Sequence, residues 1–233
     1  MASRGKLVAI EGIDGSGKRT QIELLAGDLD RRAISFSQIS FPVYGSFFGK
    51  MVARFLNGGF GPLEAVDPHF SALLYAGNRL ESKPRMEASL DAGKIVLADR
   101  YVGSNLAHQA SRMPRDKRDE FQKWLRQLEY EVYGLPAEDL VIYLRVPPAE
   151  AQRLAGERAG REYTSMKRDL QESSLAHLEA ASAAYDQLAL QPPWVRIECF
   201  DEAAHSLRSP AVIHEEVVKA MDARICSSLQ AKG

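Results

Sequence analysis

The chain has 233 residues, of which 45% are hydrophobic and 26% charged, and its formal net charge is −1. This composition is ordinary for a globular protein long enough to bury a substantial core. The balanced charge excludes the broad basic field by which proteins grip nucleic acid or an anionic membrane, so any affinity for phosphate must be local. No apolar stretch approaches the roughly 18 residues that span a bilayer. No targeting leader precedes the first apolar run, so we expect a cytoplasmic protein.

Short apolar runs followed by segments of helical periodicity recur along the chain. This alternation predicts βαβ units, and hence a parallel sheet covered by helices on both faces. We therefore expect a single three-layer α/β domain over residues 1–233, with about five strands. The last run contains Cys199, which we expect to be a small core residue. The predicted strands are Leu7–Ile10, Ile34–Ile39, Ile95–Ala98, Leu140–Val146 and Val195–Cys199.

Three segments between the predicted strands stand out. A long helix is expected from Asp67 to Leu90, because Asp67 can cap it and Pro68 suits its first turn. Residues 41–66 contain a Phe-Pro pair, glycines and aromatics, which indicates loop mixed with short helix. Residues 156–169 are polar and basic, and they form either a solvated loop or, since they follow a βα unit, a mobile lid. The basic residues of this lid candidate are Arg158, Arg161, Lys167 and Arg168.

The strongest motif directly follows the first predicted strand and satisfies the phosphate-loop (P-loop) pattern G-x-x-x-x-G-K. Its glycines let backbone N–H groups turn toward phosphate oxygens, and the next helix adds its positive N-terminus. Lys18 supplies a charge for the β- and γ-phosphates of a bound nucleotide. The loop candidates are Gly12, Ile13, Asp14, Gly15, Ser16, Gly17, Lys18, Arg19 and Thr20.

Arg19 breaks the usual pattern, in which a Ser or Thr hydroxyl at this position ligates Mg²⁺. A guanidinium has no lone pair to offer a metal, and Thr20 lies one position further round the helix. Either Mg²⁺ is held by other oxygens, or Arg19 itself supplies part of the positive charge. The sequence leaves both alternatives open.

Four motifs occur in the order found in thymidylate kinases, a family of P-loop nucleoside monophosphate kinases that the chain resembles from about residue 6 to residue 190. The basic segment at 156–169 resembles the family's lid. The resemblance implies transfer of the γ-phosphate of ATP to dTMP, in dTTP synthesis, with Mg²⁺ as a cofactor. Relatives pair as homodimers through helices, which implies a homodimer here. The four motifs are Glu11–Lys18, Phe41–Tyr44, Leu74–Arg79 and Asp99–Asn105.

The resemblance also implies a role for each matched residue of the acceptor site. Tyr75 and Arg79 are four apart on one helical face, so thymine would stack on Tyr75 while Arg79 donates to its O4. Such a donor would oppose the amino group of cytosine. Asn105 resembles the residue that bonds thymine N3. Asp14 would bind the deoxyribose 3′-hydroxyl and His108 would wall off a 2′-hydroxyl, and the other substrate-binding candidates are Phe41, Tyr44, Arg100 and Ser104.

Phosphoryl transfer needs in-line placement and positive charge more than covalent chemistry. Lys18 and Arg100 would supply this charge together with the lid arginines Arg158 and Arg161. In this superfamily the catalytic arginine sits either in the phosphate loop or in the lid. Gly15 occupies the loop position, which points to the lid.

Asp99 would act through the metal and its water, and Glu172 falls near acidic positions that organise Mg²⁺ or the lid arginines in relatives. Two other functions remain open. One is a kinase of another deoxynucleotide or of a nucleoside. The other is a noncatalytic nucleotide-binding protein, an alternative that stays open because Arg19 replaces the usual Ser or Thr. A GTPase is disfavoured, because the chain has no Asn-Lys-x-Asp motif for guanine.

Overall fold

The computed structural model describes residues 4–156 and 174–226. Its main sheet has five parallel strands in the order β2-β3-β1-β4-β5. The predicted parallel α/β fold is confirmed, and each predicted strand lies within two residues of an observed one. The strands are β1 Lys6–Glu11, β2 Phe36–Ser40, β3 Ile95–Asp99, β4 Leu140–Arg145 and β5 Trp194–Glu198.

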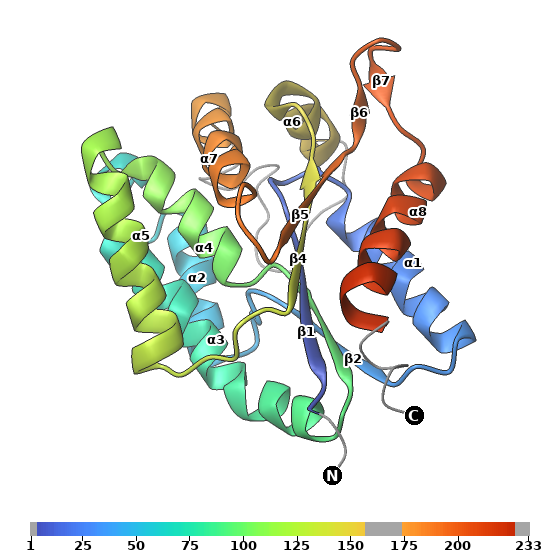
Figure 1. Ribbon diagram of the computed structural model, residues 1–233. Helices are drawn as coiled ribbons and strands as arrows, with labels where there is room; N and C mark the ends of the chain where they lie inside the picture. The colour runs from blue at the N-terminus through green and yellow to red at the C-terminus, as the bar shows by residue number, and fades with distance from the viewer. Residues whose placement is uncertain (1–3, 157–173, 227–233) are drawn as a thin grey trace.

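Helices cover both faces of this sheet (Figure 1). On one face α1 packs against α8, and on the other α3, α4 and α7 cover the central strands, with α5 outside them. Because both faces are covered, the central strands are buried almost throughout, which explains their continuous apolar runs. The helices are α1 Lys18–Arg31, α2 Phe47–Leu56, α3 Pro68–Asp91, α4 Val102–His108, α5 Arg118–Arg126, α6 Pro148–Gly156, α7 Leu175–Leu188 and α8 Pro210–Met221.

Helix α3 begins where its sequence predicts. The Asp67 side chain accepts a hydrogen bond from the His69 backbone N–H at 2.7 Å, and Pro68 occupies the first turn. Residues 41–66 contain α2 and a short 3-10 turn, as expected for loop mixed with short helix. Cys199 is 1% exposed and lies in the main core, as predicted. A small hairpin of β6 (Phe200–Asp201) and β7 (Ser206–Leu207) was not predicted from the sequence.

The register of the central strands determines where polar groups meet. Ile10 on β1 lies opposite Asp99 on β3, so Glu11 at the end of β1 and the loop that follows it lie beside Arg100. The Arg100 backbone N–H continues the pairing by donating to the Ile10 carbonyl at 3.0 Å. This meeting point is the carboxyl edge of a parallel sheet, where open α/β folds bind ligands.

A second, smaller hydrophobic cluster lies apart from the main core, between α2 and α3. Tyr44 and Tyr75 pack against its edge, and the Phe55 and Tyr75 rings meet edge to face with centroids 6.4 Å apart. The described residues include no helix both long and apolar enough to cross a membrane. The buried members of the second cluster are Val52, Phe55, Leu56, Leu63, Val66 and Leu74.

Candidate active site

The phosphate-loop candidate connects β1 to α1 and closes on its own lysine. Lys18 is 7% exposed, and its Nζ donates to the carbonyls of Gly12 at 3.0 Å and Ile13 at 2.9 Å. Burial, reinforced by the positive charge of Arg100, lowers the pKa of Lys18 to about 8. A buried amine held by two neutral carbonyls would gain a stronger partner from the negative charge of a polyphosphate.

Gly15 cannot be replaced by a larger residue without moving a helix. Its φ of +89° is a conformation that favours glycine, and a Cβ at this position would lie 2.0 Å from the Ala151 carbonyl oxygen in α6. The phosphate loop and the first turns of α6 therefore touch through backbone. This contact gives a steric reason for the lack of an arginine at position 15.

Arg100 joins the loop to the neighbouring helix α4. Its Nη2 donates to Asp14 Oδ1 at 2.6 Å, and its Nη1 donates to the Gly12 carbonyl at 3.0 Å and to Ser104 Oγ at 3.1 Å. Burial acts to raise the pKa of Asp14, but the facing charges of Arg100 and Lys18 outweigh it and hold that pKa well below its ordinary value. Asp14 is therefore ionised at any pH at which the protein would work.

Glu11 organises the start of α4 from the end of β1. It is fully buried, and its Oε1 accepts hydrogen bonds from the backbone N–H groups of Tyr101 at 2.7 Å and Ser104 at 2.9 Å. Its Oε2 accepts from Ser104 Oγ at 2.6 Å and from Tyr185 Oη at 2.9 Å. One carboxylate thus satisfies helix N–H groups that have no partner within the helix.

A cavity opens beside Arg100, and one wall of it is apolar while the other is polar. The apolar wall comes from Pro42 and Leu56, and Gln109 adds a further polar group. Two residues of the polar wall each have a buried polar atom, Asn105 Oδ1 and His108 Nε2, with no hydrogen-bond partner among the described residues. Seven predicted site residues line this cavity: Asp14, Tyr44, Tyr75, Arg100, Ser104, Asn105 and His108.

Two of the predicted substrate-binding residues do not line the cavity. Arg79 is 2% exposed, and its Nε and Nη2 each lie 2.5 Å from a carboxylate oxygen of Glu129. Phe41 is 5% exposed and packs its ring against that of Tyr101, with centroids 5.8 Å apart. In this structure Arg79 is linked to the cavity through Glu129, which contacts the lining residue Asn105.

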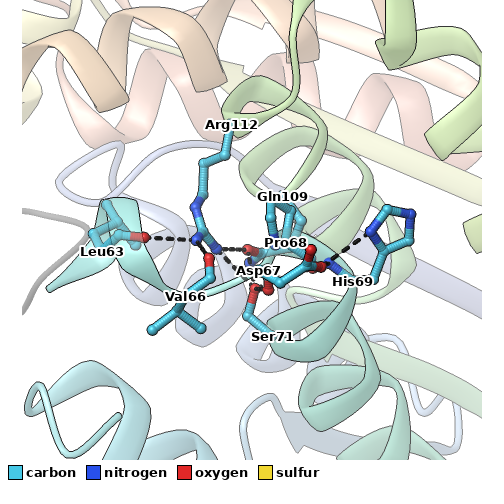
Figure 2. Close-up of polar contacts among 8 residues, drawn as sticks. All are labelled: Leu63, Val66, Asp67, Pro68, His69, Ser71, Gln109 and Arg112. Carbon is cyan, nitrogen blue, oxygen red and sulfur yellow. Dashed lines mark hydrogen bonds and ion pairs between the residues drawn. The ribbon is translucent and has the colours of Figure 1, made fainter. Parts of the chain in front are cut away.

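Arg112 contacts Gln109, a residue that lines the cavity, and two further segments meet at its guanidinium (Figure 2). Its Nη1 donates to Ser71 Oγ at 2.7 Å and to Gln109 Oε1 at 2.8 Å, and its Nη2 donates to the carbonyls of Leu63 and Val66. The one guanidinium therefore ties the turn before α3, the first turn of α3 and the residues after α4 together. No sequence motif pointed to Arg112, because its partners come from three separate segments.

The phosphate loop and the cavity adjoin each other, since Asp14 of the loop also lines the cavity. A transfer reaction between two bound molecules requires two such adjoining sites. A sequence model of the thymidylate kinase family matches residues 10–197. The chain belongs to the thymidylate kinase family.

Individual proteins agree with the thymidylate kinase assignment. The chain is 33% identical over 189 residues to thymidylate kinase of Mycobacterium tuberculosis, covering 79% of this chain and 86% of that protein. It is 38% identical over 184 residues to a probable thymidylate kinase of Pyrobaculum aerophilum, covering 76% and 84%. The structure of thymidylate kinase from Candida albicans superposes with a TM-score of 0.73 at 18% identity, covering 96% of this chain and 93% of that one, and shows a shared fold.

The residues present suit Mg²⁺ held partly by a nucleotide. Asp99 Oδ1 is buried at the end of β3 without a hydrogen-bond partner among the described residues, so it offers one carboxylate oxygen. Residues 4–156 and 174–226 hold no group of three or more His, Cys, Asp or Glu that could bind a metal by themselves. Mg²⁺ commonly keeps several waters and binds through one or two carboxylates plus phosphate oxygens, and this donor set fits that habit.

Arg19 lies on the outer surface of α1. Its side chain is 81% exposed, and its Nε lies 2.8 Å from Glu23 Oε1 one helical turn away. The side chain of Ser16, in contrast, is buried in the loop, and its Oγ has no partner in the described structure. Thr20 is exposed.

The lid candidates Arg158, Arg161 and Glu172 lie outside the described residues, as does most of the segment 156–169. Among the described residues, the site reasoning from sequence missed Glu11, Tyr185 and Glu129, although Glu11 stood in a quoted motif. Each of the three makes contacts across 24 or more positions in the sequence. Spacing within one segment could not have revealed such contacts.

Proposed function

We propose that this protein is a dTMP kinase, which transfers the γ-phosphate of ATP to dTMP and acts in the cytoplasm. The observation that carries the proposal is the position of Arg100, which contacts the Gly12 carbonyl and Asp14 in the phosphate loop and Ser104 in the cavity. ATP would occupy the loop and dTMP the cavity. Arg100 would then lie where the acceptor phosphate meets the transferring group.

The chain's own residues would act through position and charge. Lys18 would leave the Gly12 and Ile13 carbonyls and bind the β- and γ-phosphates of ATP. Arg100 would exchange part of its contact with Asp14 for the acceptor phosphate, which frees the Asp14 carboxylate for the deoxyribose 3′-hydroxyl. Tyr75 would pack against the base, with Asn105 at its polar edge. Arg158 and Arg161, which lie outside the described residues, would add positive charge for the transferring phosphoryl group.

Mg²⁺, when bound, would supply positive charge that stabilises the transferring phosphoryl group. Asp99 would hold it through the unpaired Oδ1, with phosphate oxygens and waters completing the shell. Glu172 is a further candidate for the region of the metal and the lid. The acceptor phosphate is already ionised, so no side chain is needed as a strong general base.

A coupled assay of ADP release, run against a panel of nucleoside monophosphates and nucleosides, tests the proposed reaction. We expect turnover with dTMP and Mg-ATP, and little with dCMP, dAMP or thymidine. Preference for another acceptor would assign a different kinase. Absence of turnover with every acceptor, in a sample that binds ATP, would favour the noncatalytic alternative.

We further propose that two copies pair through α2 and α3. The outer face of α3 exposes Phe70, Leu73 and Leu80, each between 37% and 39% exposed, and Phe47 on α2 is 70% exposed. Apolar side chains gathered on neighbouring helices mark an interaction surface. Light scattering should give a dimer mass for the native chain and a monomer mass for Leu73→Glu, whereas Leu190→Glu, at a residue 70% exposed elsewhere, should remain dimeric.

A further inference from the structure

Glu129 is a fully buried acidic side chain that contacts the cavity residue Asn105, and nothing in the transfer chemistry uses it. It lies in the π-helical turn η4 (Gln127–Val132) that continues α5. Its Oε2 accepts from Arg79 Nε at 2.5 Å. Its Oε1 accepts from Arg79 Nη2 at 2.5 Å and from Asn105 Nδ2 at 2.9 Å. A single carboxylate thus holds side chains from both α3 and α4.

Asn105 lines the cavity, and its contact with Glu129 determines which end of its amide is left without a partner. The amide nitrogen carries two protons, and these are used by Glu129 Oε1 and by the Ala72 carbonyl at 3.1 Å. Both partners are acceptors, so the amide oxygen cannot take the place of the nitrogen without facing two other oxygens. Asn105 Oδ1 is left as the side chain's free polar atom, and it has no partner within the described residues.

An unpaired buried acceptor costs free energy that a bound donor recovers. The thymine ring carries a proton on N3 and can donate to Oδ1, whereas cytosine N3 is an acceptor and would face another acceptor. A reversed amide would have the opposite preference. The orientation of a single side-chain amide therefore separates the two pyrimidines.

We propose that Glu129 is the positioning residue that sets pyrimidine specificity, by holding the Asn105 amide with its oxygen toward the cavity. The inference rests on the proposed function for the identity of the acceptor and goes beyond it in naming what orients the recognition group. Glu129 does not touch the nucleotide. It acts through Asn105, and its second partner, Arg79, neutralises its charge in the interior.

The test is the ratio of the dissociation constants for dTMP and dCMP, measured by calorimetry on the full chain. In Glu129→Gln the new side chain can donate as well as accept, so only the Ala72 carbonyl still opposes the reversed orientation of the Asn105 amide. We expect the preference for dTMP over dCMP to fall by about tenfold, the effect of roughly one hydrogen bond. A merely structural role would weaken both ligands equally and leave the ratio unchanged, which would overturn the proposal.

Two comparisons isolate the path through Asn105. Glu138→Gln is the matched control. Glu138 is partly buried and does not line the cavity, and its carboxylate accepts a hydrogen bond at 2.7 Å from Tyr130 Oη, which lies next to Glu129 in η4. This control should keep the native ratio. In an Asn105→Ala background Glu129→Gln should cause no further change in the ratio, whereas a persistent change would assign the effect to Arg79 instead.

A crystal structure of the native chain with dTMP tests the same point without any variant. We expect thymine N3 against Asn105 Oδ1 while Nδ2 still faces Glu129, and an amide nitrogen facing the base would overturn the proposal. A native protein that binds no pyrimidine monophosphate at all would refute the proposed function. A native protein that binds dTMP, and whose preference survives Glu129→Gln, would refute only the role of Glu129.

Discussion

Asp14 and Arg100 form an ion pair of 2.6 Å that links the phosphate loop to the residue after β3. Their side chains are only 27% and 15% exposed, so the charge of each side chain is stabilised mainly by the opposite charge of the other. The Arg100 backbone has a φ of +65°, which few non-glycine residues adopt. The surrounding structure must hold a residue in such a conformation, and the Arg100 guanidinium is itself held by Asp14 and Gly12.

Replacement of Arg100 by Lys should lower kcat by about 100-fold, the usual cost of losing one charge-stabilising donor. An ammonium cannot contact Gly12, Asp14 and Ser104 in the fixed geometry of a guanidinium. Steady-state kinetics with ATP and dTMP measure the loss. Arg196→Lys, which changes an arginine paired with Asp186 on the far edge strand β5, is the matched control and should keep native kcat.

ATP binding should take up a proton near pH 8. Burial lowers the pKa of Lys18 to about 8, so at pH 8 about half of the ATP-free protein has a neutral Lys18 amine. Bound phosphates should raise that pKa, so that the amine becomes protonated. Calorimetry in buffers of different ionisation enthalpy should detect an uptake of about half a proton at pH 8 and almost none at pH 6. Lys18→Arg, which does not titrate, should show no such uptake at either pH.

Arg19→Thr should leave the requirement for Mg²⁺ intact and retain measurable activity. The Arg19 side chain is mostly in solvent and pairs with Glu23 along the helix, so it is not positioned as a ligand substitute. Exposed pairs of this kind contribute at most about 1 kcal/mol to stability. Turnover of either protein in excess EDTA would contradict this account, and turnover of the native protein alone would indicate that Arg19 replaces the metal.

Arg79→Ala should destabilise the fold by about 3–5 kcal/mol, because it leaves the Glu129 carboxylate buried without its charge partner. Urea denaturation measures the loss. The double variant Arg79→Ala with Glu129→Leu should recover part of it, since no isolated charge remains. A single variant as stable as the native protein would show that Glu129 is solvated or protonated without Arg79.

The fold should lose stability as the pH falls below about 6.5, partly through His177. Burial lowers the pKa of His177 to about 4, and the ring contacts His108 at 3.3 Å. Between pH 6.5 and pH 4 His177 is protonated in the unfolded chain but neutral in the native chain. The free energy of unfolding therefore falls as the pH falls. For one such histidine, the free energy of unfolding is lower at pH 5 than at pH 7 by about 1–2 kcal/mol. Urea titrations of the native chain and His177→Asn at both pH values should give a smaller difference for the variant.

Local patterns in the sequence were sufficient for the strands, the phosphate loop and the start of α3. Each of these depends on residues a few positions apart. Apolar runs are buried between helices on both faces, Gly12 and Gly15 adopt backbone angles closed to most residues, and Asp67 caps the helix that follows it. The resemblance to known motifs also selected seven residues that the fold gathers around one cavity.

The pairing of buried charges was decided only by the tertiary structure. Arg79 and Glu129 are 50 positions apart, and Glu11 meets Tyr185 across 174 positions, so no periodicity links them. A helical pattern shows which face an arginine occupies, but it does not show which acid shares its interior environment. Burial makes an unpaired charge costly, so the partner brought near by the fold determines where such a side chain points. For Arg79 that partner is Glu129, and its guanidinium therefore does not line the cavity.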